Sequence, residues 1–250
     1  MSAFQIVLLG FAGIAAGMIN SVVGSGTLVT FPVLLAFGYP PVTANVSNTI
    51  GLVPGSLAGA WGYRGRLAGQ RANVVRLGAA SVLGGVVGAA ILLRLPASTF
   101  DAIVPGFIAV ALVLTVIQTR LRARLQRRAR PSSRRGVVTT LAVFGSGVYG
   151  GYLGAGQGII LLGILGVALA QDLQRTNGLK NLLAGLVNGV AGIYFVSTVH
   201  VEWAPAAVIA VTSMLGAHLG ARYGQRLQPS ALRSIIVVVG IIAIVSLVNG

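Results

Sequence analysis

The chain is 250 residues long, with 55% hydrophobic residues, 8% charged residues, no cysteine and a net charge of +15. A soluble fold of this length could not bury so much apolar surface, so the composition excludes one and indicates an all-α integral membrane protein. The positive charge lies in short gaps between apolar runs, which is typical of cytoplasmic loops and argues against a nucleic-acid partner.

Apolar runs separated by polar gaps predict two sets of five helices. The first set covers about residues 4–23, 27–37, 43–63, 77–94 and 102–119, and the second covers about 137–153, 158–170, 181–199, 204–221 and 234–249. Between them lie eight arginines from Arg120 to Arg135, together with Pro131, which predicts a break. We therefore divide the chain into a first transmembrane repeat (1–119), a basic cytoplasmic linker (120–136) and a second repeat (137–250).

The two halves share a glycine-rich motif. Gly17-Met-Ile-Asn-Ser-Val-Val-Gly-Ser-Gly26 returns 130 residues later as Gly147-Val-Tyr-Gly-Gly-Tyr-Leu-Gly-Ala-Gly156. At an offset of 132 residues, Asn45 aligns with Asn177, Gly84 with Gly216 and Gly88 with Gly220. Glycine-interrupted membrane segments at corresponding positions of two halves are the best sequence indication of a transporter's binding site.

The arginines also predict the orientation of the chain. The gaps around Arg64, Arg175 and Arg222, together with the linker, are expected on the cytoplasmic side of the inner (cytoplasmic) membrane. Lys180 is counted with Arg175 in one such gap. Both termini then lie outside, each half has an odd number of segments, and the halves become inverted-topology repeats.

We expect eight to ten membrane segments in this multi-pass protein. Residues 27–37 would form a helix of about 16 Å, roughly half of the ~30 Å hydrocarbon core. The first two segments of each half therefore either cross twice or re-enter, and the sequence leaves this open. Either arrangement preserves the topology of the rest.

The glycine breaks form the first candidate binding site. Helices that begin near Thr27 and Gly158 would leave unpaired amides and the positive end of a helix dipole at each break, which suits an anion. The alternatives are close helix packing and a simple turn; a nucleotide-binding glycine loop would need a βαβ unit. The candidate residues here are Asn20, Ser21, Gly24, Ser25, Gly26, Thr27, Gly154, Gly156 and Gln157.

A second candidate cluster opens the third helix of each half. Asn45 and Thr49 share one helix face, as do Asn177 and Asn181, because each pair is four residues apart. Ordinary N-capping at the membrane surface is the alternative interpretation. The cluster consists of Asn45, Ser47, Asn48, Thr49, Asn177, Lys180 and Asn181, with Lys180 as the charge partner of an anion.

The acidic residues argue against cation coupling. Asp101, Asp172 and Glu202 fall in or beside loops, so no carboxylate remains for a relay inside the membrane. His218 is the one ionisable side chain well inside a predicted helix, and a packing or snorkelling role competes there with proton transfer. We find no catalytic, metal or cofactor arrangement and expect none. An anion leaving a negative-inside cell gains about 2.3 kcal/mol per 100 mV, so export needs no coupling.

The sequence resembles the sulfite exporter family named for TauE and SafE. The resemblance rests on the Gly17–Gly26 motif followed by Thr27-Leu28, on Phe31-Pro32, on Gly38-Tyr-Pro-Pro-Val-Thr-Ala-Asn45, and on the weaker second copy of the motif. It covers nearly the whole chain. It implies a membrane protein that moves small sulfur-containing anions such as sulfite or organosulfonates, a class that also includes toluene sulfonate uptake permeases.

Together these features predict an exporter of small sulfur-containing anions that works by alternating access at a central anion site. The alternatives are an anion channel and a transporter of another small organic anion. An intramembrane enzyme lacks a credible nucleophile or acid–base pair, and a passive scaffold would tolerate leucine at both Gly24 and Gly154. The expected partners are the anion and the lipid bilayer, and a homo-oligomer is left open.

Overall fold

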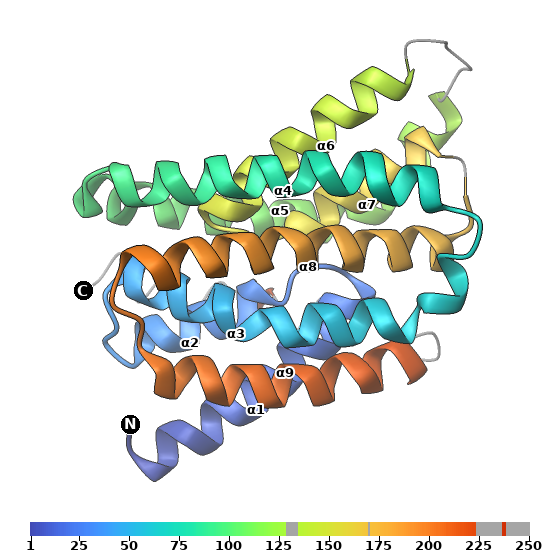
Figure 1. Cartoon of the computed structure of the whole chain (residues 1–250). Coiled ribbons are helices and arrows are strands. Elements are labelled where there is room, and N and C mark those ends of the chain that lie inside the picture. Colours follow the sequence, from blue (N-terminus) through green and yellow to red (C-terminus); the bar gives the residue numbers. More distant parts are fainter. Residues whose placement is uncertain (129–134, 170, 224–236, 239–250) are drawn as a thin grey trace.

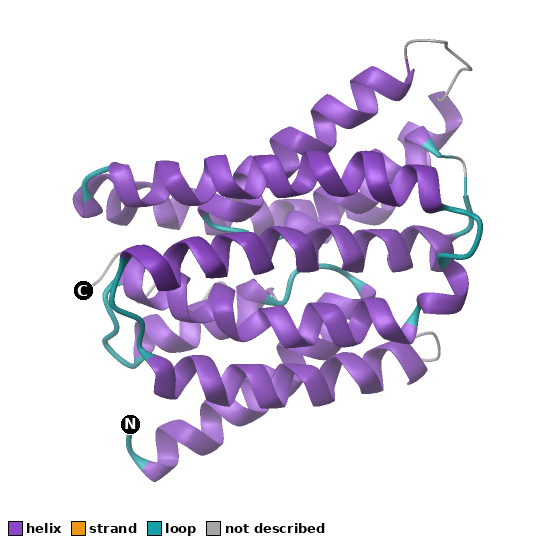
Figure 2. Ribbon diagram, in the orientation of Figure 1, coloured by secondary structure: helices purple, strands orange, loops and turns teal. Residues whose placement is uncertain are grey.

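The computed structural model describes residues 1–128, 135–169, 171–223 and 237–238. Every regular element among these residues is a helix, which confirms the all-α class (Figure 2). The elements are α1 (Ala3–Val22), α2 (Thr27–Ala36), α3 (Pro41–Gly62), the 3-10 turn η1 (Arg64–Arg66), α4 (Arg71–Arg94), α5 (Ala97–Arg128), α6 (Arg135–Tyr152), α7 (Gln157–Ala168), α8 (Leu173–Thr198) and α9 (Trp203–Tyr223).

Most of the predicted helices are confirmed, but several boundaries were wrong. α4 begins at Arg71 instead of residue 77, because its first turn is charged and was read as part of a loop. α5 runs on to Arg128 and α6 begins at Arg135, so both ends of the expected linker are helical. The predicted helix at 234–249 lies almost wholly outside the described residues.

The start of α8 is the most consequential correction. The Asp172 carboxylate accepts hydrogen bonds from the backbone N–H groups of Gln174 and Arg175, each at 2.9 Å, and so caps a helix that begins at Leu173. The sequence interpretation began this helix at residue 181, since the residues before it are polar. Lys180 therefore does not lie in a cytoplasmic gap: it sits two turns inside α8 and is buried.

α3, α4, α8 and α9 lie roughly along one axis, and α1 and α6 are inclined to it (Figure 1). α3 and α9 run from left to right, whereas α4 and α8 run from right to left. α1 enters from the left end and α2 returns to that end, while α6 enters from the right end and α7 returns there. The α1–α2 pair thus enters the bundle from one end and the α6–α7 pair enters from the other. Both glycine breaks lie in the middle of the bundle.

Five described helices are long and apolar enough to cross a membrane. They are α1, α4, α5 over Ala97–Gln118, α8 and α9. α2 and α7 have 10 and 12 residues, about 15 and 18 Å at 1.5 Å per residue, and are too short to cross alone. The number of eight to ten segments stays a prediction.

Glycines permit the closest helix packing. A Cβ atom on Gly84 of α4 would collide with the carbonyl oxygen of Phe144 in α6, and one on Gly216 of α9 would collide with that of Ile14 in α1. Gly84 and Gly216 align at the offset of 132, and Ile14 and Phe144 align at 130. The α1–α9 and α6–α4 pairs thus pack through equivalent residues, as small residues allow in lipid.

Candidate functional site

Both glycine breaks are short and left-handed. Gly24 has φ +92° between α1 and α2, and Gly154 and Gly156 have φ +74° and +75° between α6 and α7. An L side chain rarely adopts this conformation, so glycine is required there. The predicted new helix starts near Thr27 and Gly158 are confirmed, since α2 begins at Thr27 and α7 at Gln157.

The two breaks touch each other. A Cβ atom on Gly24 would lie 2.6 Å from the Cα of Gly158, a distance at which a real Cβ is essentially never found. A Cβ on Gly154 would lie 3.9 Å from Thr27 Oγ1. Each break therefore lies against the start of the short helix of the other half.

The Lys180 side chain binds the C-terminal end of α1, just before the first break. Its Nζ donates hydrogen bonds to the carbonyl oxygens of Asn20 at 2.6 Å and Ser21 at 3.2 Å. Asn181 Nδ2 donates to the same Ser21 oxygen at 3.0 Å. These carbonyls belong to the last turn of α1, which leaves them without intrahelical donors. A cation at the C-terminal end of a helix is also favoured by the helix dipole.

The corresponding helix α3 contacts the second break. Asn45 Nδ2 donates a hydrogen bond of 2.9 Å to the carbonyl oxygen of Tyr152, the last residue of α6. α8 therefore satisfies the end of α1, and α3 satisfies the end of α6. Asn45, Lys180 and Asn181 therefore bind the opposite half, and the caps of α3 and α8 are other residues, Pro40 and Asp172.

Asn48 takes a different role from its counterpart Lys180. Its Oδ1 accepts a short hydrogen bond from Thr30 Oγ1, and its Nδ2 donates to Thr27 Oγ1 at 3.5 Å. Both partners belong to α2, in the same half. The positions aligned at an offset of 132 therefore hold a neutral amide in one half and an ammonium group in the other.

Aromatic side chains surround the second break. The Tyr149 hydroxyl donates to the carbonyl oxygen of Ala155 inside the break. The Phe100 and Tyr152 rings lie 5.6 Å apart, and the Phe107 ring lies 5.7 Å from Tyr149 and 6.0 Å from Tyr152. These distances are typical of favourable aromatic pairs. A cluster of aromatic rings from α5 and α6 thus packs beside this break.

The amide side chains near the breaks are arranged differently in the two halves. Asn20 Nδ2 donates to Ser56 Oγ at 3.2 Å, whereas Gln157 Nε2 donates to the carbonyl oxygen of Ser146 at 3.2 Å. The Gln157 side chain lies against Gly150, the residue aligned with Asn20. A Cβ atom on Gly150 would overlap the amide group of Gln157. Gly26 is equally crowded, since its Cβ would lie 2.9 Å from the Asn20 Cβ.

The polar candidate side chains are almost fully enclosed. Their exposed fractions are between 0% and 7%, for Ser21, Ser25, Thr27, Asn45, Ser47, Asn48, Thr49, Gln157, Asn177, Lys180 and Asn181. Asn20 is half-buried. Several enclosed atoms make no hydrogen bond to the residues that the structure describes: Ser25 Oγ, Ser47 Oγ, Asn45 Oδ1 and Asn177 Oδ1. Such groups are costly to bury unless a ligand or water satisfies them.

A sequence profile described as Sulfite exporter TauE/SafE matches residues 9–247 of this chain. The chain belongs to the TauE/SafE family. It is 27% identical over 242 residues to the probable membrane transporter protein ORF9 of Sinorhizobium sp, covering 96% of this chain and 91% of that protein. It is 25% identical over 244 residues to the probable membrane transporter protein YfcA of Escherichia coli (strain K12), covering 96% and 88%.

A probable membrane transporter protein of Haemophilus influenzae is 23% identical over 239 residues, with 93% of this chain and 90% of that protein covered. No solved structure matches the chain. With its apolar helices, membership of this membrane transporter family makes the chain a multi-pass membrane protein in a lipid bilayer. The resemblance predicted from the glycine motifs is thereby confirmed.

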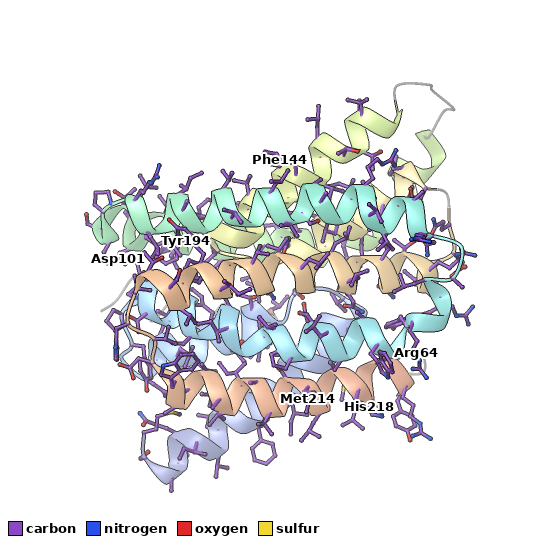
Figure 3. All side chains as sticks on the ribbon, in the orientation of Figure 1. Arg64, Asp101, Phe144, Tyr194, Met214 and His218 are labelled. Atoms are coloured by element: carbon purple, nitrogen blue, oxygen red, sulfur yellow. The ribbon has the colours of Figure 1, made fainter. Side chains whose placement is uncertain are left out.

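Apart from the buried Lys180, the charged side chains that the structure describes in this TauE/SafE protein lie near the ends of helices. Arg64 lies at one end and Asp101 at the other (Figure 3). Asp172 is exposed, and backbone hydrogen bonds from Arg175 and then Gln174, with the charges of Arg66 and Arg175, hold its pKa below the usual range. His218 is exposed on the outer side of α9 (Figure 3), away from the enclosed polar groups.

Sequence reasoning missed several residues of the site. Each of the missed residues contacts a candidate residue from another helix or from a break. Thr30 donates to Asn48, Ser56 accepts from Asn20, and Gly158 contacts Gly24. Tyr149 and Tyr152 lie inside the second glycine motif, and this position in the motif was a usable signal. The contacts of Thr30, Ser56 and Gly158 depend on long-range packing and leave no local pattern.

Proposed function

We propose that this protein transports small sulfur-containing anions, such as sulfite or organosulfonates, across the inner membrane through a central site at the two glycine breaks. The observation that carries the proposal is the contact of Gly24 in the first break with Gly158 at the start of α7, beside the buried cation Lys180. Backbone amides at the starts of α2 and α7, together with neutral hydroxyl and amide groups, would bind the oxygens of the anion. The resemblance to sulfite exporters supports the sulfur-containing class.

Carrier behaviour is favoured over a channel by the burial of the site. The polar candidate side chains other than Asn20 are 0% to 7% exposed, so the site has little contact with solvent. An open anion channel needs a continuous aqueous path. A site enclosed in this way is typical of the occluded state through which an alternating-access carrier passes.

An inverted repeat would provide the alternation. α1 and α6 run in opposite directions, as do α3 and α8 (Figure 1), and Gly84 and Gly216 pack against aligned residues. Each half would then open the site toward one side as it rocks against the other. Six arginines of the described residues lie at the ends of helices on one side of the bundle, and the N-terminus lies on the other side: Arg64, Arg66, Arg71, Arg76, Arg175 and Arg222. The positive-inside rule then favours a cytoplasmic arginine end and an N-terminus outside.

Export is the proposed direction, since the membrane potential drives an anion out of a negative-inside cell by about 2.3 kcal/mol per charge per 100 mV. The test is flux of sulfite, thiosulfate and ethanesulfonate in liposomes that contain the purified protein, with and without an imposed potential. Saturable flux of at least one of these ions supports the carrier. Flux that stays linear in concentration at channel-like rates would favour the channel, and no flux of any of them would reject the anion class.

A further inference from the structure

The proposed site carries a single fixed charge. Lys180 is the only charged side chain among the buried residues that the structure describes. The whole chain contains three acidic residues, and none can neutralise it: Asp101 and Asp172 are exposed, and Glu202 precedes α9 at the opposite end of the bundle from Asp172. Within the described part of the chain, the Lys180 ammonium group is bound by two neutral carbonyl oxygens.

The hydrogen-bond partners of Lys180 stabilise its charged form against the cost of burying a charge. The Nζ to Asn20 oxygen distance of 2.6 Å is as short as that of a charge-assisted hydrogen bond. The acceptors are the last carbonyls of α1, where the helix dipole attracts a cation. An ammonium group has three N–H donors, and two of them are used by Asn20 and Ser21. The third donor remains for a ligand.

Two further hydroxyl groups are available without adding charge. Ser25 lies in the first break and Ser47 lies in the first turns of α3. Each side chain is 1% exposed, and its Oγ has no hydrogen-bond partner among the described residues. Hydroxyl groups can donate to the oxygens of a sulfonate or sulfite group. The enclosed donors are therefore one ammonium group and several neutral groups.

We infer that the site selects monovalent anions, so that the loaded carrier is electrically neutral and the empty carrier holds one positive charge. This inference rests on the proposed function. One bound negative charge compensates Lys180, whereas a divalent ion would leave one buried negative charge without a partner. The substrate class is thus a small sulfonate, or sulfite in its singly charged form, in preference to divalent oxyanions.

If the loaded carrier is neutral, exchange and net flux should differ in how strongly their rates depend on the membrane potential. Exchange of labelled for unlabelled ethanesulfonate uses only the loaded carrier, and we expect its rate to change less than about twofold when 100 mV is imposed. Net flux requires the charged empty carrier to return, and its rate should change by up to about 50-fold over the same potential. Both fluxes are measured on the full-length wild-type protein in the same liposomes.

A matched pair of ions tests the selectivity. Ethanesulfonate carries one charge and 1,2-ethanedisulfonate carries two throughout the accessible pH range. We expect the monosulfonate to be transported faster by a factor of about 100 or more, because an uncompensated buried charge is strongly unfavourable. Equal rates for the two ions would overturn the inference, and so would exchange that follows the potential as steeply as net flux does.

Two variants locate the charge. K180M that still transports should show exchange that depends on the potential, because its loaded site would carry one negative charge. K180R keeps the charge and should keep the wild-type pattern at a lower rate. If the potential has the same effect on K180M as on the wild type, the inference is wrong while the proposed function stands. Absence of flux for every sulfonate and oxyanion in the wild type would overturn both.

Discussion

The two glycine breaks have similar backbones and different chemical surroundings. Gly24 and Gly154 both adopt left-handed conformations and both end a long helix in the middle of the bundle. The first break is held by the buried ammonium group of Lys180, which reaches across from the other half. The second is held by a neutral amide from Asn45 and by the Tyr149 hydroxyl. The backbone frame is thus shared between the halves, whereas the charge belongs to one half alone.

If the shared frame depends on glycine, G24L should disrupt it severely. Leucine would adopt an unfavourable positive φ and collide with the backbone of Gly158, which together cost about 2–6 kcal/mol. We expect loss of folded protein in detergent, seen by size-exclusion chromatography and thermal unfolding. The control is G38A, where φ is +84° but nothing lies within 4 Å of the added Cβ. Equal effects of G24L and G38A would show that contact between the breaks is unimportant.

The outer packing of the two halves should respond alike to substitution. G84A and G216A each place a methyl group against a carbonyl oxygen of the facing helix, and each should lower the free energy of unfolding by about 1–3 kcal/mol. G189A is the matched control, since nothing lies within 4 Å of its Cβ in α8 and alanine favours a helix. Thermal unfolding of the three variants checks this. A large loss for one of the first two and none for the other would argue against equivalent halves.

The second break should depend on one tyrosine hydroxyl and not on its neighbour. Y149F removes the donor to the buried Ala155 oxygen, and we expect a loss of about 1–3 kcal/mol in the free energy of unfolding. Y152F removes a buried hydroxyl that makes no hydrogen bond to any described residue, so it should be neutral or slightly stabilising. Thermal unfolding measures both. No loss in either variant would assign the support of this break to aromatic packing alone, because phenylalanine keeps the ring.

The helices and the breaks could be predicted from the sequence because their signals are local. Apolar runs indicated the helices, and glycines in two copies of one motif indicated where α1 and α6 end. Lys180 was placed in a loop because the residues before it are polar. Asp172 is a typical N-cap residue, and it could have indicated that α8 begins before residue 181.

The arrangement of the site was harder to predict because it depends on contacts between distant segments. Asn45 and Lys180 were candidates from their polarity, but their carbonyl partners lie 107 and 160 residues away along the chain. The difference between Asn48 and Lys180 could be read at the offset of 132, whereas its consequence required knowledge of what each side chain binds.

The most direct test of the central anion site is the initial rate of ethanesulfonate flux in liposomes that contain either wild-type protein or K180M at equal, verified insertion. Lys180 donates two hydrogen bonds to the end of α1 and supplies the only buried charge among the described residues. Hydrogen bonds to a charged group contribute about 1.5–3 kcal/mol, so we predict a loss of about tenfold or more in rate. A wild-type rate in K180M would remove Lys180 from the site and contradict the account.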